Sequence, residues 1–195
     1  MLKILSYFKP KARPEVIDAR RIYQKTMQQS RNRAFFGADK FSDTYDGRME
    51  TLCLHLSVIL HTLRQFDVQG QRLSQAIYDE MVADFDIALR EEGLSDTGVS
   101  RRIKPLAKMF FERVKAYEDI LSQDNSEDFN QEASLQKILV RYLALTHSAD
   151  VDETISVVKE ASVDFSTYVC ALSLELSGKT LGQIANIDFQ YPAFK

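Results

Sequence analysis

Two aspartates inside an apolar run are the first residues of this sequence that could carry chemistry. They are Asp84 and Asp86, in the segment MVADFDIALREEG. On a helix their carboxylates diverge by about 200°, so one face cannot hold a metal ion between them. Asp86 has Arg90 four residues away, the spacing of a surface ion pair. Asp84 lies at the edge of an apolar stripe, so we predict a structural ion pair with Arg48 or Arg101, because an unpaired buried charge is costly. Partner binding and catalysis are the alternatives for Asp84.

The three histidines do not strengthen the case for catalysis or metal binding. His55 and His61 are six residues apart, about 240° around a helix, and His147 is distant in sequence. The sequence contains no glycine-rich phosphate loop, nucleophile elbow or CxxC motif. We therefore expect no metal, no cofactor and no small-molecule substrate. An enzyme of unrecognised type is the alternative, with Asp84, His55 and Tyr117 as its first candidates.

The elements that must position these residues are predicted to be helices. Of the 195 residues, 45% are hydrophobic and 27% charged, and only seven are glycine and four proline. So few turn residues favour long helices over short strands. No apolar run reaches the length of about 18 residues that a membrane span requires. Cys53 and Cys170 are expected to be reduced, packed thiols.

Periodicity predicts a single compact all-α domain of about six helices. Their expected ranges are 14–30, 44–66, 71–92, 99–122, 131–146 and 151–176, with a short helix in the tail. The second helix is apolar almost all the way round, so we expect it at the centre. The segment DVQG is expected to end it, and Pro105 to lie near the first turns of the fourth helix.

The fourth helix has a basic face that stability alone does not explain. Its apolar side is formed by Val99, Ile103, Leu106, Phe110, Val114, Tyr117 and Leu121. On the opposite side, Arg101, Lys104, Lys108 and Lys115 fall within an arc of about 60°. Like charges repel, so we predict that this row docks an acidic partner, RNA or lipid headgroups. A solvated face beside acids such as Glu112 is the alternative.

The beginning of the chain is also basic. Residues 1–33 contain nine Lys or Arg and two acids, a net charge of +7, whereas the whole chain carries −3. We predict that residues 1–13 form a basic lead before a helical domain over residues 14–195. The lead is expected to contact anionic lipid or a ribosome, with a solvated arm as the alternative.

Two stretches resemble the ubiquinol–cytochrome c chaperone family, SDTYDGRMETLCLH and QRLSQAIYDEMVADFDIALREEGLSDTGVSRRIKPLAKMFFERVKAYE. The resemblance covers residues 20–122. It lies in DGR before an apolar Leu-His helix, a Gln-Ala-aromatic-Asp turn, a D-x-D-x-x-L-R-E-x-G segment and a basic helix ending in Tyr. The chain departs from the family at SRNRAFFGADKF, where a proline-containing segment is expected. Asp46, Arg48 and Arg90 belong to the shared motifs, and we expect them to contact a partner.

The resemblance implies an all-helical, non-enzymatic chaperone that binds newly made cytochrome b and helps to assemble respiratory complex III. Mitochondrial members also work with a small partner protein near the ribosomal exit tunnel. No anchor or long presequence is recognised, which indicates a bacterial member in the cytoplasm, peripheral at the inner membrane. The mitochondrial matrix and inner membrane are the alternative location. DNA is not expected as a partner, and an RNA- or ribosome-binding helical module is a further alternative.

Overall fold

The chain folds into helices that follow the predicted order. The computed structural model describes residues 13–124, 126, 129–147 and 151–194, so the predicted lead lies outside the described residues except for Arg13. The α-helices are α1 Pro14–Ser30, α2 Tyr45–Leu63, α3 Asp67–Glu91, α4 Asp96–Leu121, α5 Gln131–Leu145, α6 Val151–Ser177 and α7 Leu181–Ala185. Short 3-10 turns, η2 Arg33–Phe35 and η3 Arg64–Phe66, adjoin α2. No strand occurs in the described part of the chain, which confirms the all-α prediction.

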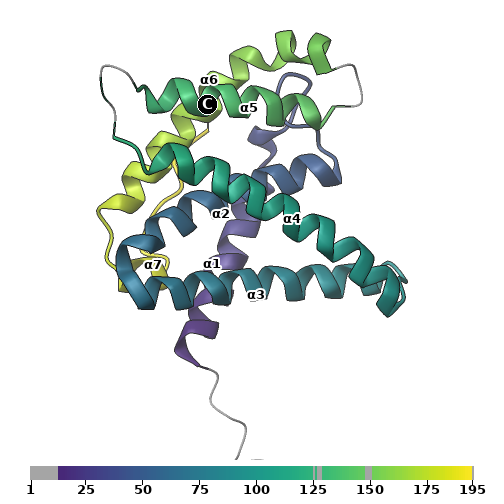
Figure 1. Ribbon diagram of the computed structural model, residues 1–195, viewed down its shortest axis with the longest axis vertical. Coiled ribbons are helices and arrows are strands. Elements are labelled where there is room, and N and C mark those ends of the chain that lie inside the picture. The colour runs from purple at the N-terminus through teal and green to yellow at the C-terminus, as the bar shows by residue number, and fades with distance from the viewer. Residues whose placement is uncertain (1–12, 125, 127–128, 148–150, 195) are drawn as a thin grey trace, which may run out of the picture.

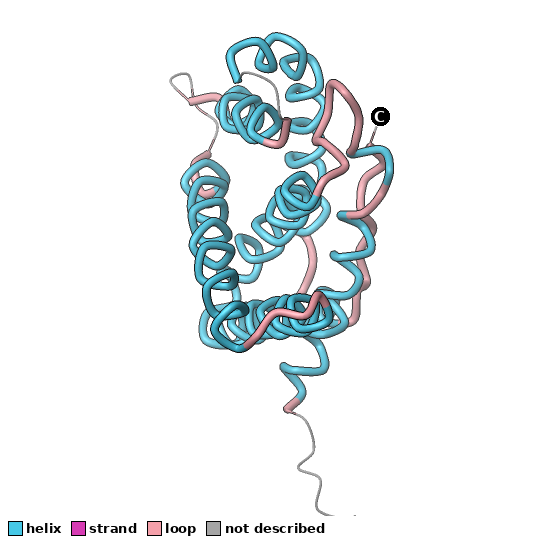
Figure 2. The backbone as a smooth tube through the Cα atoms, turned by 90° about the vertical axis from the view of Figure 1, so that its right-hand side faces the viewer, coloured by secondary structure: helices cyan, strands magenta, loops and turns pink. Residues whose placement is uncertain are grey.

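Helix α2 is the central element, as its sequence predicts. Fifteen of its 19 residues are buried, and it contacts α1, α3, α4 and α6. Its predicted stripe of Leu52, Ile59 and Leu63 is at most 2% exposed. Figure 1 shows α4 crossing in front of α2, and the side view in Figure 2 places α4 in an outer layer. One face of α4 is therefore anchored on the core and the other is available to solvent.

Helices α3 and α4 form a V whose arms rest on different supports. Helix α3 packs mainly on α1, whereas α4 packs mainly on α2. The arms meet at Gly93, whose φ of 86° is the left-handed conformation expected of a glycine that ends a helix. From this corner the two helices separate towards the start of α3 (Figure 1). Side chains from both arms, together with Leu60 of α2, line a groove between them.

The segment DVQG begins α3 instead of ending α2 with a free loop. The chain turns at Asp67, which has a φ of 47°, and enters the new helix immediately. A Cβ atom on Gly70 would lie 1.8 Å from the carbonyl oxygen of Leu63. The glycine is thus required for the close approach of two helices, and its presence was wrongly taken as a helix stop.

Pro105 lies in the interior of α4, which corrects its predicted place near the first turns. The helix begins at Asp96 because Ser95 caps it, with Ser95 Oγ accepting a hydrogen bond from Gly98 N. Proline cannot donate the usual bond to the carbonyl of Arg101. Both residues are exposed, so water can satisfy that carbonyl. The helix continues through Leu121, so the residues before and after Pro105 keep one phase.

Candidate functional site

A groove between α3 and α4 combines an apolar floor with polar edges. It has a volume of about 570 Å³, within the usual range for ligand clefts. Its floor is formed by Leu60, Tyr78, Phe110 and Val114. Phe111 stands at the α4 lip with 53% of its surface exposed. We refer to this feature as the α3–α4 groove.

Aromatic contacts across the V give the groove its shape. The ring centroids of Tyr78 on α3 and Phe111 on α4 are 4.9 Å apart, and those of Tyr78 and Phe110 are 6.0 Å apart. Phe110 is 1% exposed and belongs to the core, whereas its neighbour Phe111 is half outside it. Exposed aromatic surface of this kind is typical of residues that anchor a protein partner.

The basic residues predicted on the fourth helix lie beside this groove. Arg101, Lys104, Lys108 and Lys115, here called the basic row, are all exposed. At about 100° per residue, the four residues of the row lie between about 20° and about 80° around the helix from Phe111. Lys108 Nζ lies 3.8 Å from Glu112 Oε1, and none of the other three has an ion pair within the described residues. The row therefore lies on the solvent side of Phe111, next to the groove but not among its lining residues, and only Lys108 of the row has an ion pair in the described part of the chain.

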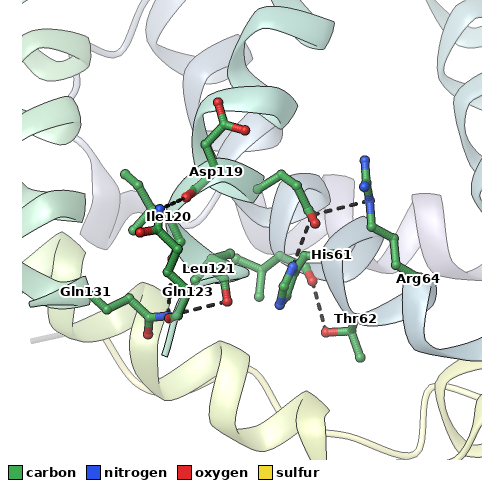
Figure 3. Close-up of polar contacts among 10 residues, drawn as sticks. His61, Thr62, Arg64, Asp119, Ile120, Leu121, Gln123 and Gln131 are labelled. Atoms are coloured by element: carbon green, nitrogen blue, oxygen red, sulfur yellow. Dashed lines mark hydrogen bonds and ion pairs between the residues drawn. The ribbon is translucent and has the colours of Figure 1, made fainter. Parts of the chain in front are cut away.

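Arg64 lies at the end of the groove and is held by a carboxylate. Arg64 Nε and His61 Nδ1 both contact Glu118 Oε2, at 3.3 Å and 3.0 Å (Figure 3). Nearby, the amide of Gln131 donates to the carbonyls of Leu121 and Gln123 and caps the end of α4. These contacts fix the C-terminal half of α4 relative to α2 and α5.

An interior ion pair sets the distance between α4 and α2. Arg113 Nη2 lies 2.6 Å from Glu50 Oε1, and the two side chains are 14% and 5% exposed. The guanidinium also lies over the ring of Tyr142 on α5, 3.9 Å from its centroid. Burial alone lowers the pKa of Arg113, but its hydrogen bonds and the charge of Glu50 outweigh burial and raise it. Arg113 is therefore held in its charged form against the side chain of Glu50.

A second hollow, the α1–α2 cleft, lies at the start of α2 and has a volume of about 400 Å³. Met27, Met49 and Phe85 line it together with Arg48, one of the predicted partner residues. Arg48 Nε donates to Asp43 Oδ1 at 2.7 Å, a bond that lowers the pKa of Asp43.

The start of α2 explains part of the DGR motif without any partner. Asp46 is exposed in the first turn of α2, and its side chain has no hydrogen-bond partner among the described residues. A Cβ atom on Gly47 would lie 1.9 Å from the carbonyl oxygen of Ser42. The glycine of DGR is thus required by the fold, whereas the charges on either side of it face solvent.

Asp84 has a different partner from the one its sequence indicates. It is exposed, and Tyr23 Oη on α1 donates to its Oδ2 at 2.8 Å. Burial and this hydrogen bond raise the pKa of Tyr23 above its ordinary value. Of the two cations expected to pair with Asp84, Arg48 is bound to Asp43 and Arg101 belongs to the basic row. The prediction of an ion pair was wrong because the edge of the α3 stripe faces a tyrosine of α1.

Arg90 holds the corner of the V together. It pairs with Asp86 at 2.6 Å, as its spacing predicts, and also with Asp96 at the start of α4. These hydrogen bonds raise the pKa of Arg90. The second partner was not foreseen because it depends on how the α3–α4 turn closes.

The three candidates for an unrecognised enzyme do not share a site. His55 is buried and contacts Thr51 O at 2.7 Å and Tyr168 Oη at 2.8 Å, and burial lowers its pKa to about 4. Tyr117 is also buried, with no described partner for its hydroxyl group, whereas Asp84 is exposed. Both cysteines are free thiols, and burial raises the pKa of each.

Two further properties of the described residues limit what the arrangement can do. No three His, Cys, Asp or Glu side chains in this part of the chain are grouped as a metal site requires. In the same residues, no helix combines the length and apolar character needed to cross a bilayer. The groove with its basic row is thus the feature with the clearest potential for binding.

Comparisons with known proteins agree with the resemblance noted in the sequence. A family model described as ubiquinol–cytochrome C chaperone matches residues 40–165, a range that contains the groove and the basic row. The crystal structure of the Cbp3 homologue from Brucella abortus is similar to this one, with a TM-score of 0.72 and 28% sequence identity over 98% of each chain. Among curated proteins, no match is found. The similarity therefore extends beyond residue 122, through α5 and into α6.

Proposed function

Because this chain belongs to the ubiquinol–cytochrome c chaperone family, we propose that it binds newly made cytochrome b and supports assembly of respiratory complex III. Because the family is one of chaperones, we expect the partner to be another protein. The proposed role is binding without catalysis. The single observation that carries it is the α3–α4 groove, where Phe111 and an apolar floor lie beside the basic row.

The chemistry of the groove suits a segment that has not yet entered its final environment. A newly made membrane subunit exposes apolar helices that must be shielded before assembly. The groove can receive apolar side chains, since Phe110 and Tyr78 provide a preformed floor. The basic row adds electrostatic attraction, which speeds association and selects the partner more than it strengthens the complex. The proposed mode is a helix lying in a groove.

Two other surfaces are proposed as secondary contacts. Asp46 and Arg48 flank the start of α2 at the α1–α2 cleft, and the Arg90 side chain is 48% exposed at the corner of the V. We propose that they contact the client or a small partner protein. The basic lead is proposed to meet anionic lipid or the ribosome. Such contacts would place the protein at the inner face of the membrane that receives cytochrome b, in a bacterium or a mitochondrion.

Purification of the tagged protein from its own host tests the function. Cytochrome b is expected to co-purify with the wild-type chain, and the change Lys104→Glu with Lys108→Glu is expected to remove it and to reduce complex III. The matched control is Lys137→Glu with Lys159→Glu, which reverses two exposed lysines on α5 and α6. Thermal midpoints of both variants are measured first. Normal complex III at normal abundance in the basic-row variant would refute the role of the row, and absence of cytochrome b from the wild-type sample would refute the proposed client.

A further inference from the structure

We infer that the α3–α4 groove takes an amphipathic helical segment whose carboxylates lie along one flank only, the flank that faces α4. This inference rests on the proposed function and specifies the chemistry of the segment that the groove receives. It follows from a difference between the two walls of the groove. On α4 the basic row lies next to the Phe111 lip, outside the lining of the groove, whereas the α3 residues that line the groove present neutral hydrogen-bonding groups.

The α3 wall is neutral where it lines the groove. Its polar lining residues are Gln71, Ser74 and Gln75, which carry amide and hydroxyl groups. The nearby acid Asp79 accepts a hydrogen bond from Gln75 Nε2 at 2.8 Å. Glu80 turns away to α1, where Arg20 holds it at 3.1 Å. A segment lying in the groove therefore meets no unpaired charge from the lining of this wall.

The basic row on α4 has one ion pair among the described residues, between Lys108 and Glu112. Glu118 is already shared by His61 and Arg64, and Glu112 reaches only Lys108. Lys104 and Lys115 have no ion pair within the described residues and lie on the same side of the helix as Phe111. An incoming carboxylate on this flank would gain a partner, whereas a lysine there would meet like charge.

The dimensions of the groove indicate how such a segment would lie. A helix is about 10 Å across, so a hollow of about 570 Å³ receives anchoring side chains while the helix axis lies above it. Along α4, Lys104 precedes Lys108 by about 6 Å and Lys115 by about 16 Å, at 1.5 Å per residue. Carboxylates one turn and then two turns apart along one flank would face these three lysines.

A protein segment fits this site better than a bilayer surface does. Phe111 lies between the row and the hollow, and its ring centroid is 4.9 Å from that of Tyr78 and 5.7 Å from that of Phe110. A residue that inserts into lipid would be expected to stand clear of its neighbours on an outward face. The aromatic lip instead continues the floor of the groove, which is the geometry of a peptide-binding cleft.

Binding of three synthetic peptides to the full-length protein tests the inference. All three peptides have the same apolar face and carry Gln on one flank. On the other flank the first peptide carries Glu, the second Gln and the third Lys. Fluorescence anisotropy is measured at about 50 mM salt and at about 500 mM salt, where charges are strongly screened. We expect the Glu peptide to bind about tenfold more tightly than the Gln peptide at low salt, with the Lys peptide weakest. The differences should shrink at high salt.

Two variants assign the preference to the groove. Neutralising the three lysines of the row by Lys104→Gln, Lys108→Gln and Lys115→Gln should remove the preference for Glu but keep binding of the Gln peptide. Phe111→Ser should weaken all three peptides. The controls are Lys137→Gln with Lys159→Gln, and Leu174→Ser, which removes an apolar side chain that is 76% exposed on α6. Neither control should change binding.

Each contrary outcome has its own meaning. Equal binding of the three peptides would overturn the inference, as would a preference for Glu that survives neutralisation of the row. It would also be overturned if no peptide bound while vesicles containing anionic lipid bound through the row. If the Glu preference holds but cytochrome b does not co-purify from the host, the chemistry of the groove stands and the proposed client is wrong.

Discussion

Arg113 of α4 and Glu50 of α2 form a two-pronged ion pair in the interior, with Arg113 Nη2 2.6 Å from Glu50 Oε1 and Nε 2.8 Å from Oε2. The pair joins α4, the helix that carries the basic row, to the central helix α2. Because Tyr142 covers the guanidinium, the same contact also ties α5 to this centre. The pair therefore fixes α4, which forms one wall of the groove, against the central helix α2.

The first prediction concerns the strength of this pair. Glu50→Gln leaves Arg113 charged and largely buried without its counter-ion, so we expect a loss of about 3–5 kcal/mol in the free energy of unfolding. Urea denaturation measures it. The double change Glu50→Leu with Arg113→Leu should lose less stability than the sum of the losses from Glu50→Leu alone and Arg113→Leu alone, because it removes both charges. The control Glu80→Gln breaks an exposed pair with Arg20 and should change little. If the losses from the two single changes simply add up in the double variant, Glu50 and Arg113 are not directly coupled.

A double-mutant cycle tests the contact between Asp84 and Tyr23. Either Asp84→Ala or Tyr23→Phe should reduce the free energy of unfolding by about 1 kcal/mol, the usual contribution of one hydrogen bond. The two changes together should cost little more than one of them, because both remove the same bond. If the two losses of stability add fully, the hydrogen bond between Asp84 and Tyr23 does not account for them. If Asp84→Ala leaves stability unchanged but removes client binding, Asp84 acts in binding and not in folding.

The protein should become less stable as the pH is lowered, because His55 is buried as the neutral base. Burial lowers its pKa from 6.5 to about 4. Between these values the unfolded chain binds more protons, so acidification favours unfolding, and the stability present above the unfolded pKa is lost as pH falls. From pH 7 to pH 5 the contribution of this group is about 2 kcal/mol.

Comparison with His55→Gln isolates that contribution. The variant should be less stable at pH 7, since it disturbs the bonds to Thr51 and Tyr168, but its stability should depend less on pH. Urea denaturation at both pH values gives the difference. The same pH dependence in the variant and in the wild type would contradict the assignment of the effect to His55.

The basic lead is predicted to act in attachment and not in folding. Removing residues 1–12 leaves Arg13, whose carbonyl accepts the first backbone bond of α1 from Val16, so the thermal midpoint should not change. Each basic residue near an anionic bilayer adds about 1 kcal/mol of attraction, which falls as salt rises. Flotation with anionic vesicles should therefore be weaker for the truncated chain. Equal flotation of both chains would refute the attachment role.

Helix order, the central place of α2 and the apolar face of α4 were predictable because each depends on periodicity within one element. The basic row was found in the same way, and its position beside a groove follows from the way α4 packs. The groove itself could not be predicted, because it depends on the separation of α3 from α4 in space. Tyr78 gave no signal of its own as a groove residue, since one aromatic on a helix is most often core.

Some missed features did leave a signal in the sequence. Arg113 is a single charge on the apolar side of α4, and Glu50 is a charge at the start of the apolar α2. Lone charges on two helices that are expected to pack indicate a buried pair. Gly70 was misinterpreted because a glycine at a close approach and a glycine at a helix end look alike in sequence. The partner of Asp84 depended on which side of α3 meets α1, and periodicity does not supply that.

The central claim is that the client lies in the α3–α4 groove, and site-specific photocrosslinking during synthesis of cytochrome b tests it most directly. A photoreactive phenylalanine analogue replaces Phe111 at the lip of the groove in one strain and Leu174 on α6 in another. Both positions are exposed, at 53% and 76%, so a nonspecific encounter would label both. We predict a crosslink to newly made cytochrome b from position 111 and none from position 174. Crosslinking from position 174 alone, equal crosslinking from both positions, or none from position 111 in a strain that assembles complex III would contradict it.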